Sequence, residues 1–118
     1  MTEYIDKTGA TVTVDRADSI EAFEVRDASG ELAGHADFRD HAGQRVFHHT
    51  VVDEEFGGRG IGTALVRGAV EATREEGITI VPVCSMVEGF LGKNADEFAG
   101  AYREATDADR ARFGGEDG

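Results

Sequence analysis

The residues best suited to chemistry are seven in a row, Gly57–Thr63, which read GGRGIGT. Glycines let the backbone turn tightly and approach a ligand without collisions from side-chain carbons. If a helix begins after such a turn, its first N–H groups have no partners inside the helix, and its dipole favours an anion there. A diphosphate fits this description. The spacing matches neither the GxGxxG dinucleotide pattern nor a triphosphate loop ending in GK[ST].

Two further side chains are reactive, the thiol of Cys84 and the imidazole of His49. Free cysteine is among the most buried residue types, so Cys84 also fits a small core residue. His49 follows His48, and because successive strand side chains alternate, we expect the two on opposite faces. A hydrogen-bonded sheet histidine is an equally good interpretation of His49. His35 and His41 complete the histidines, but no metal-ligand spacing recurs, so no metal site is predicted.

An antiparallel meander must come before the glycine turn. Three segments, 20–25, 32–38 and 45–52, have strand-like patterns and are separated by turns at 27–30 and 40–43. They predict three sequential strands joined by loops of ordinary length.

The hydrophobic period changes after residue 60, where apolar positions follow the spacing of one helix face over 61–73 and Gly77 is a natural end. Residues 78–84 form a β-branched apolar run, typical of a strand covered on both faces. A helix between two strands is a crossover, so 45–52 and 78–84 should be parallel neighbours. Two helices are expected afterwards, around 85–93 and 96–112. The predicted fold class is α+β, with a mixed, mainly antiparallel sheet and one β-α-β crossover.

The length of 118 residues suits one domain. We assign residues 1–19 to a polar lead-in, 20–112 to the domain and 113–118 to a frayed tail. The stretch Thr11–Val14 fits either a strand or an ordered part of the lead-in.

The charge is strongly negative, with 24 acidic and 12 basic residues and a formal net charge of −12. Such a field repels nucleic acid and anionic membranes, so neither is an expected partner. Self-repulsion weakens in molar salt, where the Debye length falls to about 3 Å. The acidic surface, with only two lysines, therefore favours a halophilic protein over an ordinary acidic one.

The expected location is the cytoplasm. No apolar run approaches the roughly 20 residues that span a membrane, and the N-terminus shows no signal-peptide pattern. One cysteine forms no internal disulfide, which suits a reducing compartment. We expect a monomer or a weak homodimer.

A strand, then a glycine loop, then an amphipathic helix resembles the coenzyme A site of the GNAT N-acetyltransferase superfamily, whose loop reads R/Q-x-x-G-x-G/A. Three segments in the same order resemble its small single-domain members, over roughly residues 20–105. They are His49–Val52, Gly58–Gly62, and Pro82–Ser85 followed by Phe90–Leu91 and Asn94.

The resemblance implies a site for acetyl-CoA as co-substrate, with no metal. Backbone groups of Thr50, Val51 and Val52 would meet the acetyl carbonyl and pantetheine arm where two parallel strands splay apart. Lys93 or Asn94 would lie near the far end of the coenzyme. The loop would hold the pyrophosphate through Gly57, Gly58, Arg59, Gly60, Ile61, Gly62 and Thr63.

The resemblance also places Cys84 near the acetyl group, as nucleophile or as proton donor to the departing thiol. It makes His49 the base or proton relay. The chain departs from the pattern in two ways. Gly57 stands where Gln or Arg is usual, leaving Arg59 as the expected substitute. The tyrosine that serves many relatives as general acid is absent, with Phe90 nearby and Tyr102 further along.

The implied function is acetyl transfer from acetyl-CoA to an amine on a small molecule or a protein. Because the usual tyrosine and the helices that bind the acceptor are absent, a coenzyme-A-binding module without turnover is an alternative. A phosphate-binding or structural domain unrelated to coenzyme A is a third. The acidic run Asp53–Glu55 fits a solvated rim better than a site that attracts a cationic amine.

Overall fold

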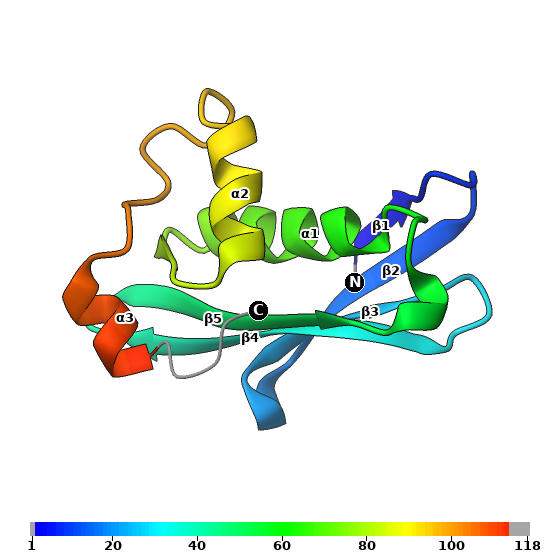
Figure 1. Cartoon of the computed structure of the whole chain (residues 1–118), viewed down its shortest axis with the longest axis horizontal. Coiled ribbons are helices and arrows are strands. Elements are labelled where there is room, and N and C mark those ends of the chain that lie inside the picture. Colours follow the sequence, from blue (N-terminus) through cyan, green and yellow to red (C-terminus); the bar gives the residue numbers. More distant parts are fainter. Residues whose placement is uncertain (1, 114–118) are drawn as a thin grey trace.

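The computed structural model describes residues 2–113, which build one six-stranded sheet carrying helices (Figure 1). The strands are β1 (Thr2–Ile5), β2 (Thr11–Ala17), β3 (Ala22–Arg26), β4 (Leu32–His41), β5 (Gln44–Val52) and β6 (Thr79–Pro82). The helices are α1 (Ile61–Glu75), α2 (Ser85–Lys93) and α3 (Asp107–Phe113), with short 3-10 turns η1 (Asp18–Ile20) and η2 (Glu54–Phe56). None of these helices is long and apolar enough to span a membrane.

The order of strands across the sheet is the order along the chain, β1 to β6. All neighbours are antiparallel except β5 and β6, which are parallel and joined by the crossover through α1. This confirms the predicted α+β class, the meander and the parallel pair. The final residues of the predicted tail, from 114 onward, lie outside the described residues.

The sheet begins before residue 20, so the expected lead-in is part of the domain. Thr11–Val14 falls in β2, which pairs with β3 on one side and β1 on the other. The reason is burial, because Val12 and Val14 have 0% and 4% of their surface exposed within the main core.

Only the end of the second expected C-terminal helix forms, as α3. Gly100 has a φ of 82°, and the turn brings Ala101 beside β6, where its carbonyl accepts a hydrogen bond from the Ile80 amide. This pairing takes the segment out of helical geometry. A reciprocal cap between Thr106 and Asp109 then starts α3.

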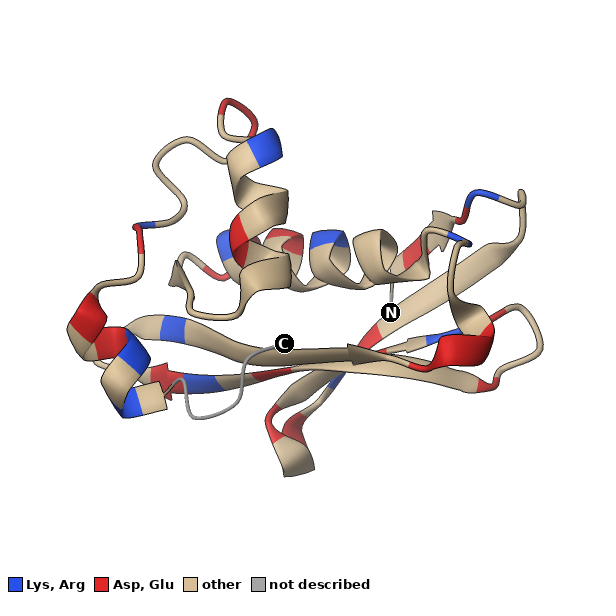
Figure 2. Ribbon diagram, in the orientation of Figure 1, with Lys and Arg blue, Asp and Glu red and all other residues tan. Residues whose placement is uncertain are grey.

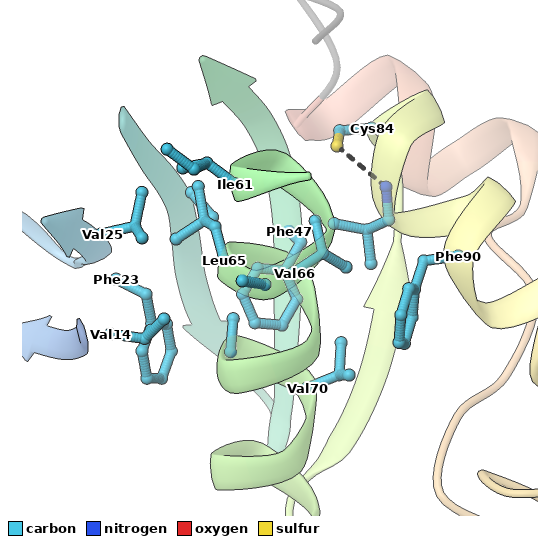
Figure 3. Close-up of a cluster of buried hydrophobic side chains, with 14 of the residues drawn as sticks. Val14, Phe23, Val25, Phe47, Ile61, Leu65, Val66, Val70, Cys84 and Phe90 are labelled. Carbon is cyan, nitrogen blue, oxygen red and sulfur yellow. Dashed lines mark hydrogen bonds between the residues drawn. The ribbon is translucent and has the colours of Figure 1, made fainter. Parts of the chain in front are cut away.

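The core lies between the sheet and α1, whose apolar face covers Phe23 and Phe47 (Figure 3). We call this side of the sheet the inner face. Helix α1 comes close to β2 because Gly68 has no side chain: an added Cβ would lie 2.8 Å from a methyl carbon of Val14. Helix α2 stands on the same side of the sheet as α1 (Figure 1).

Candidate functional site

The glycine turn leads directly into α1, and its backbone explains two of its glycines. Gly58 and Gly60 have φ values of 80° and 78°, a region that side chains with a Cβ rarely adopt. Gly62 has no such φ, and a Cβ there would make ordinary contacts with Val52 and Met86. The conformational need for glycine is therefore at positions 58 and 60.

Within residues 2–113, the first amides of α1 have no hydrogen-bond partner. Gly60 is the N-cap residue, it provides no side-chain cap, and no acidic residue lies in the first turn. The first hydrogen bond of the helix runs from the Ala64 amide to the Gly60 carbonyl. The amides of Ile61, Gly62 and Thr63 come before it and therefore have no carbonyl partner within the helix. Such a terminus is suited to bind an anion.

A groove of about 540 Å³ separates the start of α1 from α2. On the α1 side it is lined by Gly60, Gly62, Thr63, Val66 and Arg67, and on the α2 side by Ser85, Met86, Gly89, Phe90, Lys93 and Asn94. We call it the α1–α2 groove. It brings together five of the expected binding residues, from two parts of the sequence: Gly60, Gly62, Thr63, Lys93 and Asn94.

Strands β5 and β6 separate after Phe47 and Pro82. They pair only from Gln44 to Phe47, and the Phe47 carbonyl accepts both the Val83 and the Cys84 amides as β6 ends. β5 continues alone on this side to Val52. The expected splay is present, and Thr50, Val51 and Val52 lie on the strand that continues past it.

Cys84 closes the inner end of the splay. Its thiol is fully buried, lies 3.1 Å from the hydroxyl of Thr50, and accepts a hydrogen bond from the Val87 amide at the start of α2 (dashed line, Figure 3). The cap at the start of α2 is therefore the thiol itself. Sequence reasoning identified Cys84 and Thr50, but not their contact.

His49 and Cys84 are on opposite sides of the sheet. The imidazole of His49 has its centroid 6.3 Å from that of His35, and His49 pairs with Asp37 of β4. His35 and Asp37 flank Ala36, a residue of the inner core, so they face outward. The strands that carry His49 and Cys84 are adjacent, as expected, but the two side chains are not brought together.

The expectation that His48 and His49 face opposite ways is wrong. Phe47 pairs with Phe38 and His49 with Asp37, which leaves His48 as an extra residue in a β-bulge. The bulge interrupts the alternation, and His48 lines a pocket on the outer face with His35, Asp37 and Arg39. Burial lowers the pKa of His48 below its usual value, and the Nδ1 atom of His49 is buried with no partner among the described residues.

Arg59 does not point into the groove. Its guanidinium lies 5.2 Å from the ring centre of Phe56, and Arg59 is absent from the lining of the α1–α2 groove. Gly57 and Gly58 lie on the approach to α1, and the Ile61 side chain is buried in the core. Tyr102 lies against the far edge of β6, where it bridges Ile80.

Sequence reasoning missed a recess that lies next to the groove at the first turn of α1. Its volume is about 460 Å³. The strand β1 and the turn after it supply Tyr4, Ile5, Asp6 and Lys7, and α1 supplies Gly60, Thr63, Ala64 and Arg67. We call it the Lys7 recess. The one available signal was the scarcity of lysine, since Lys7 and Lys93 are the only two.

Comparisons with known proteins found a family match and a similar fold. A family profile described as GCN5-related N-acetyl-transferase matches residues 22–100, which include the glycine turn, His49 and Cys84. The solution NMR structure of a GCN5-like protein from Staphylococcus aureus superposes with a TM-score of 0.59 at 24% identity, over 80% of this chain and 91% of that chain. This likeness shows the same fold. A search of curated proteins gave no match.

Proposed function

This chain belongs to the GCN5-related N-acetyltransferase family, and from that premise we propose that it transfers the acetyl group of acetyl-CoA to an amine. The observation that carries the proposal is the uncapped N-terminus of α1 at the edge of an open groove. In a chain with 24 acidic residues, none lies in that first turn. The amides of Ile61, Gly62 and Thr63 would donate to the pyrophosphate of the coenzyme.

The coenzyme would follow the α1–α2 groove from the helix start towards the splay. Its pantetheine arm would lie beside β5 past Phe47, where β5 is no longer paired with β6. The backbone of Thr50, Val51 and Val52 belongs to this part of β5, next to the splay. Lys93 and Asn94, at the end of α2, would meet the far end of the coenzyme.

In the reaction, the amine nitrogen attacks the thioester carbonyl carbon, the C–S bond breaks, and the coenzyme leaves as a thiolate that takes up a proton. Cys84 is our candidate proton donor, since its thiol lies at the closed end of the splay. His49 is our candidate base for the proton that the amine loses. Because His49 faces outward, the acceptor would approach from the outer face of the sheet.

A covalent route through Cys84 is the main variant of this mechanism. The Cys84 thiolate would attack the thioester, coenzyme A would leave, and the amine would then take the acetyl group from Cys84. The Val87 amide and the Thr50 hydroxyl are two donors that would stabilise negative charge on the sulfur. The complete burial of Cys84 is the observation that favours binding without turnover.

Three measurements test the proposal. A thermal-shift comparison of acetyl-CoA, CoA and ATP should show stabilisation by the two coenzymes and not by ATP. Release of free thiol with a panel of amines should separate transfer from mere binding. Mass detection of acetyl on Cys84 after brief exposure to acetyl-CoA should separate the two routes. Absence of binding by either coenzyme would contradict the proposed function.

A further inference from the structure

The Lys7 recess contains a cation that the family's glycine-loop pattern does not include. The turn between β1 and β2 is tied to the glycine loop by a hydrogen bond of 2.6 Å from the Lys7 amide to the Arg59 carbonyl. Figure 2 shows the two segments side by side. The profile match starts at residue 22, so Lys7 lies outside the part of the chain that defines the family.

The Lys7 side chain lies across the start of α1. A Cβ built on Gly60 would be 2.9 Å from the Lys7 Cγ and 3.5 Å from its Cε, so the aliphatic stem covers the N-cap residue. The recess that Lys7 lines also includes Thr63 and Ala64, from the first turn of the same helix. The recess adjoins the α1–α2 groove, because Gly60, Thr63 and Arg67 line both.

The ammonium group of Lys7 has no ion-pair partner among the described residues. Carboxylates outnumber basic groups 24 to 12, yet Lys7 forms no ion pair within residues 2–113. The adjacent Asp6 turns one carboxylate oxygen into its own loop, where it accepts from the Thr8 and Ala10 amides. Arg67, which also borders the recess, is paired with Glu71 and Glu97.

We propose that Lys7 binds the pyrophosphate of coenzyme A, as the cation that replaces the side chain missing at Gly57. The proposal rests on the proposed function, because it assumes the coenzyme at α1. The uncapped amides and the stem of Lys7 lie at the same helix terminus, so the ammonium group would reach an anion bound to those amides. Arg59, the expected substitute, is turned towards Phe56 instead.

Calorimetric titration of the full chain tests this assignment with two ligands, CoA and dephospho-CoA, which lacks the 3′-phosphate. Lys7→Gln keeps the stem and removes the charge. It should weaken binding of both ligands to the same extent, by about tenfold, the size of one charge-assisted contact. The matched control is Arg39→Gln, which removes an exposed cation from the outer face and should change the affinity less than about twofold.

The outcomes are distinguishable. An unchanged affinity in Lys7→Gln, or a loss no larger than in Arg39→Gln, overturns the assignment and leaves the proposed function standing. A loss seen with CoA but not with dephospho-CoA places Lys7 on the 3′-phosphate and overturns the pyrophosphate assignment. If the unaltered chain binds neither ligand, the proposed function fails, and this assignment fails with it.

Discussion

The hydroxyl of Thr50 and the thiol of Cys84 share a hydrogen bond of 3.1 Å across the point where β5 and β6 separate. The contact joins the strand that continues to the strand that ends, and both side chains are buried. In the proposed reaction, a thioester in the splay would end next to this pair.

Substitution of Cys84 should separate its two candidate roles. As a proton donor, Cys84 can be replaced by Ser with appreciable activity left, and Cys84→Ala should lose about 100-fold or less in kcat. As a nucleophile, Cys84→Ala should abolish transfer and Cys84→Ser should recover little, because a hydroxyl ionises far less readily. Steady-state kinetics with acetyl-CoA decides between them. We expect the first result, and full activity in Cys84→Ala would remove the residue from the mechanism.

Gly60→Val should weaken coenzyme binding by tenfold or more. Its φ of 78° disfavours any residue with a Cβ, and the new side chain would collide with the stem of Lys7. Calorimetry with CoA measures the loss. The control is Gly92→Ala, in a helical position with open space around it, which should keep the affinity and raise the melting temperature slightly. Equal affinities in Gly60→Val and the unaltered chain would contradict the placement of the pyrophosphate.

His49→Ala should shift or remove the acid limb of the pH–rate profile if His49 takes the proton of the amine. His48→Ala is the matched comparison, because both imidazoles are on the outer face. A limb that moves in His48→Ala alone would give the role to His48, whose burial lowers its pKa. A limb that stays in both variants would exclude either histidine as the base.

Salt should stabilise the fold. The net charge of −12 makes the surface repel itself, and this repulsion weakens as ions screen it. We expect a higher melting temperature in molar KCl than in dilute buffer. A melting temperature that falls across this range would refute the halophilic interpretation.

Acid should destabilise the protein through Arg45, which is fully buried above the ring of Phe38 and pairs with Asp40 and Glu76. These contacts hold the pKa of both carboxyls below their usual values. The stabilisation is therefore complete above the unfolded pKa values, and it is lost as the pH falls through the lower folded ones.

Asp40→Asn should lower the melting temperature at pH 7 and make its decline below about pH 4.5 shallower. Glu104→Gln, at an exposed carboxyl, is the control and should leave the acid decline unchanged. If the melting temperature falls with pH equally steeply in Asp40→Asn and in the unaltered chain, the Asp40–Arg45 ion pair does not determine the stability in acid.

Much of the fold could be predicted because local patterns are strong where burial is one-sided. Burial alternates along most of β3 and β4, α1 has a continuous apolar face, and β6 is largely apolar. β1 was not predictable, because Thr2 and Ile5 are exposed and pairing with β2 holds the strand in place. The bulge at His48 could not be predicted either, because it is defined by how β5 pairs with β4.

The candidate site was predictable in its residues and not in its contacts. Gly60 and Asn94 were both expected at the coenzyme, and they line one groove. The contact between Thr50 and Cys84, and the outward turn of His49, depend on where β6 ends and where β5 bulges. The position of Lys7 depends on a turn that precedes the recognisable motif by about fifty residues of sequence.

Because each strand lies beside its sequence neighbour, the domain is suited to assemble in the order in which it is synthesised. The five antiparallel strands pair through local hairpins, which close quickly and at low entropic cost. They can form on the ribosome while α1 and β6 are still inside the exit tunnel. Until the crossover docks, the inner face of the meander stays open to water and to neighbouring chains. In this order of assembly, the groove and the splay would be the last parts of the domain to form, and nascent chains would be most exposed to aggregation just before that step.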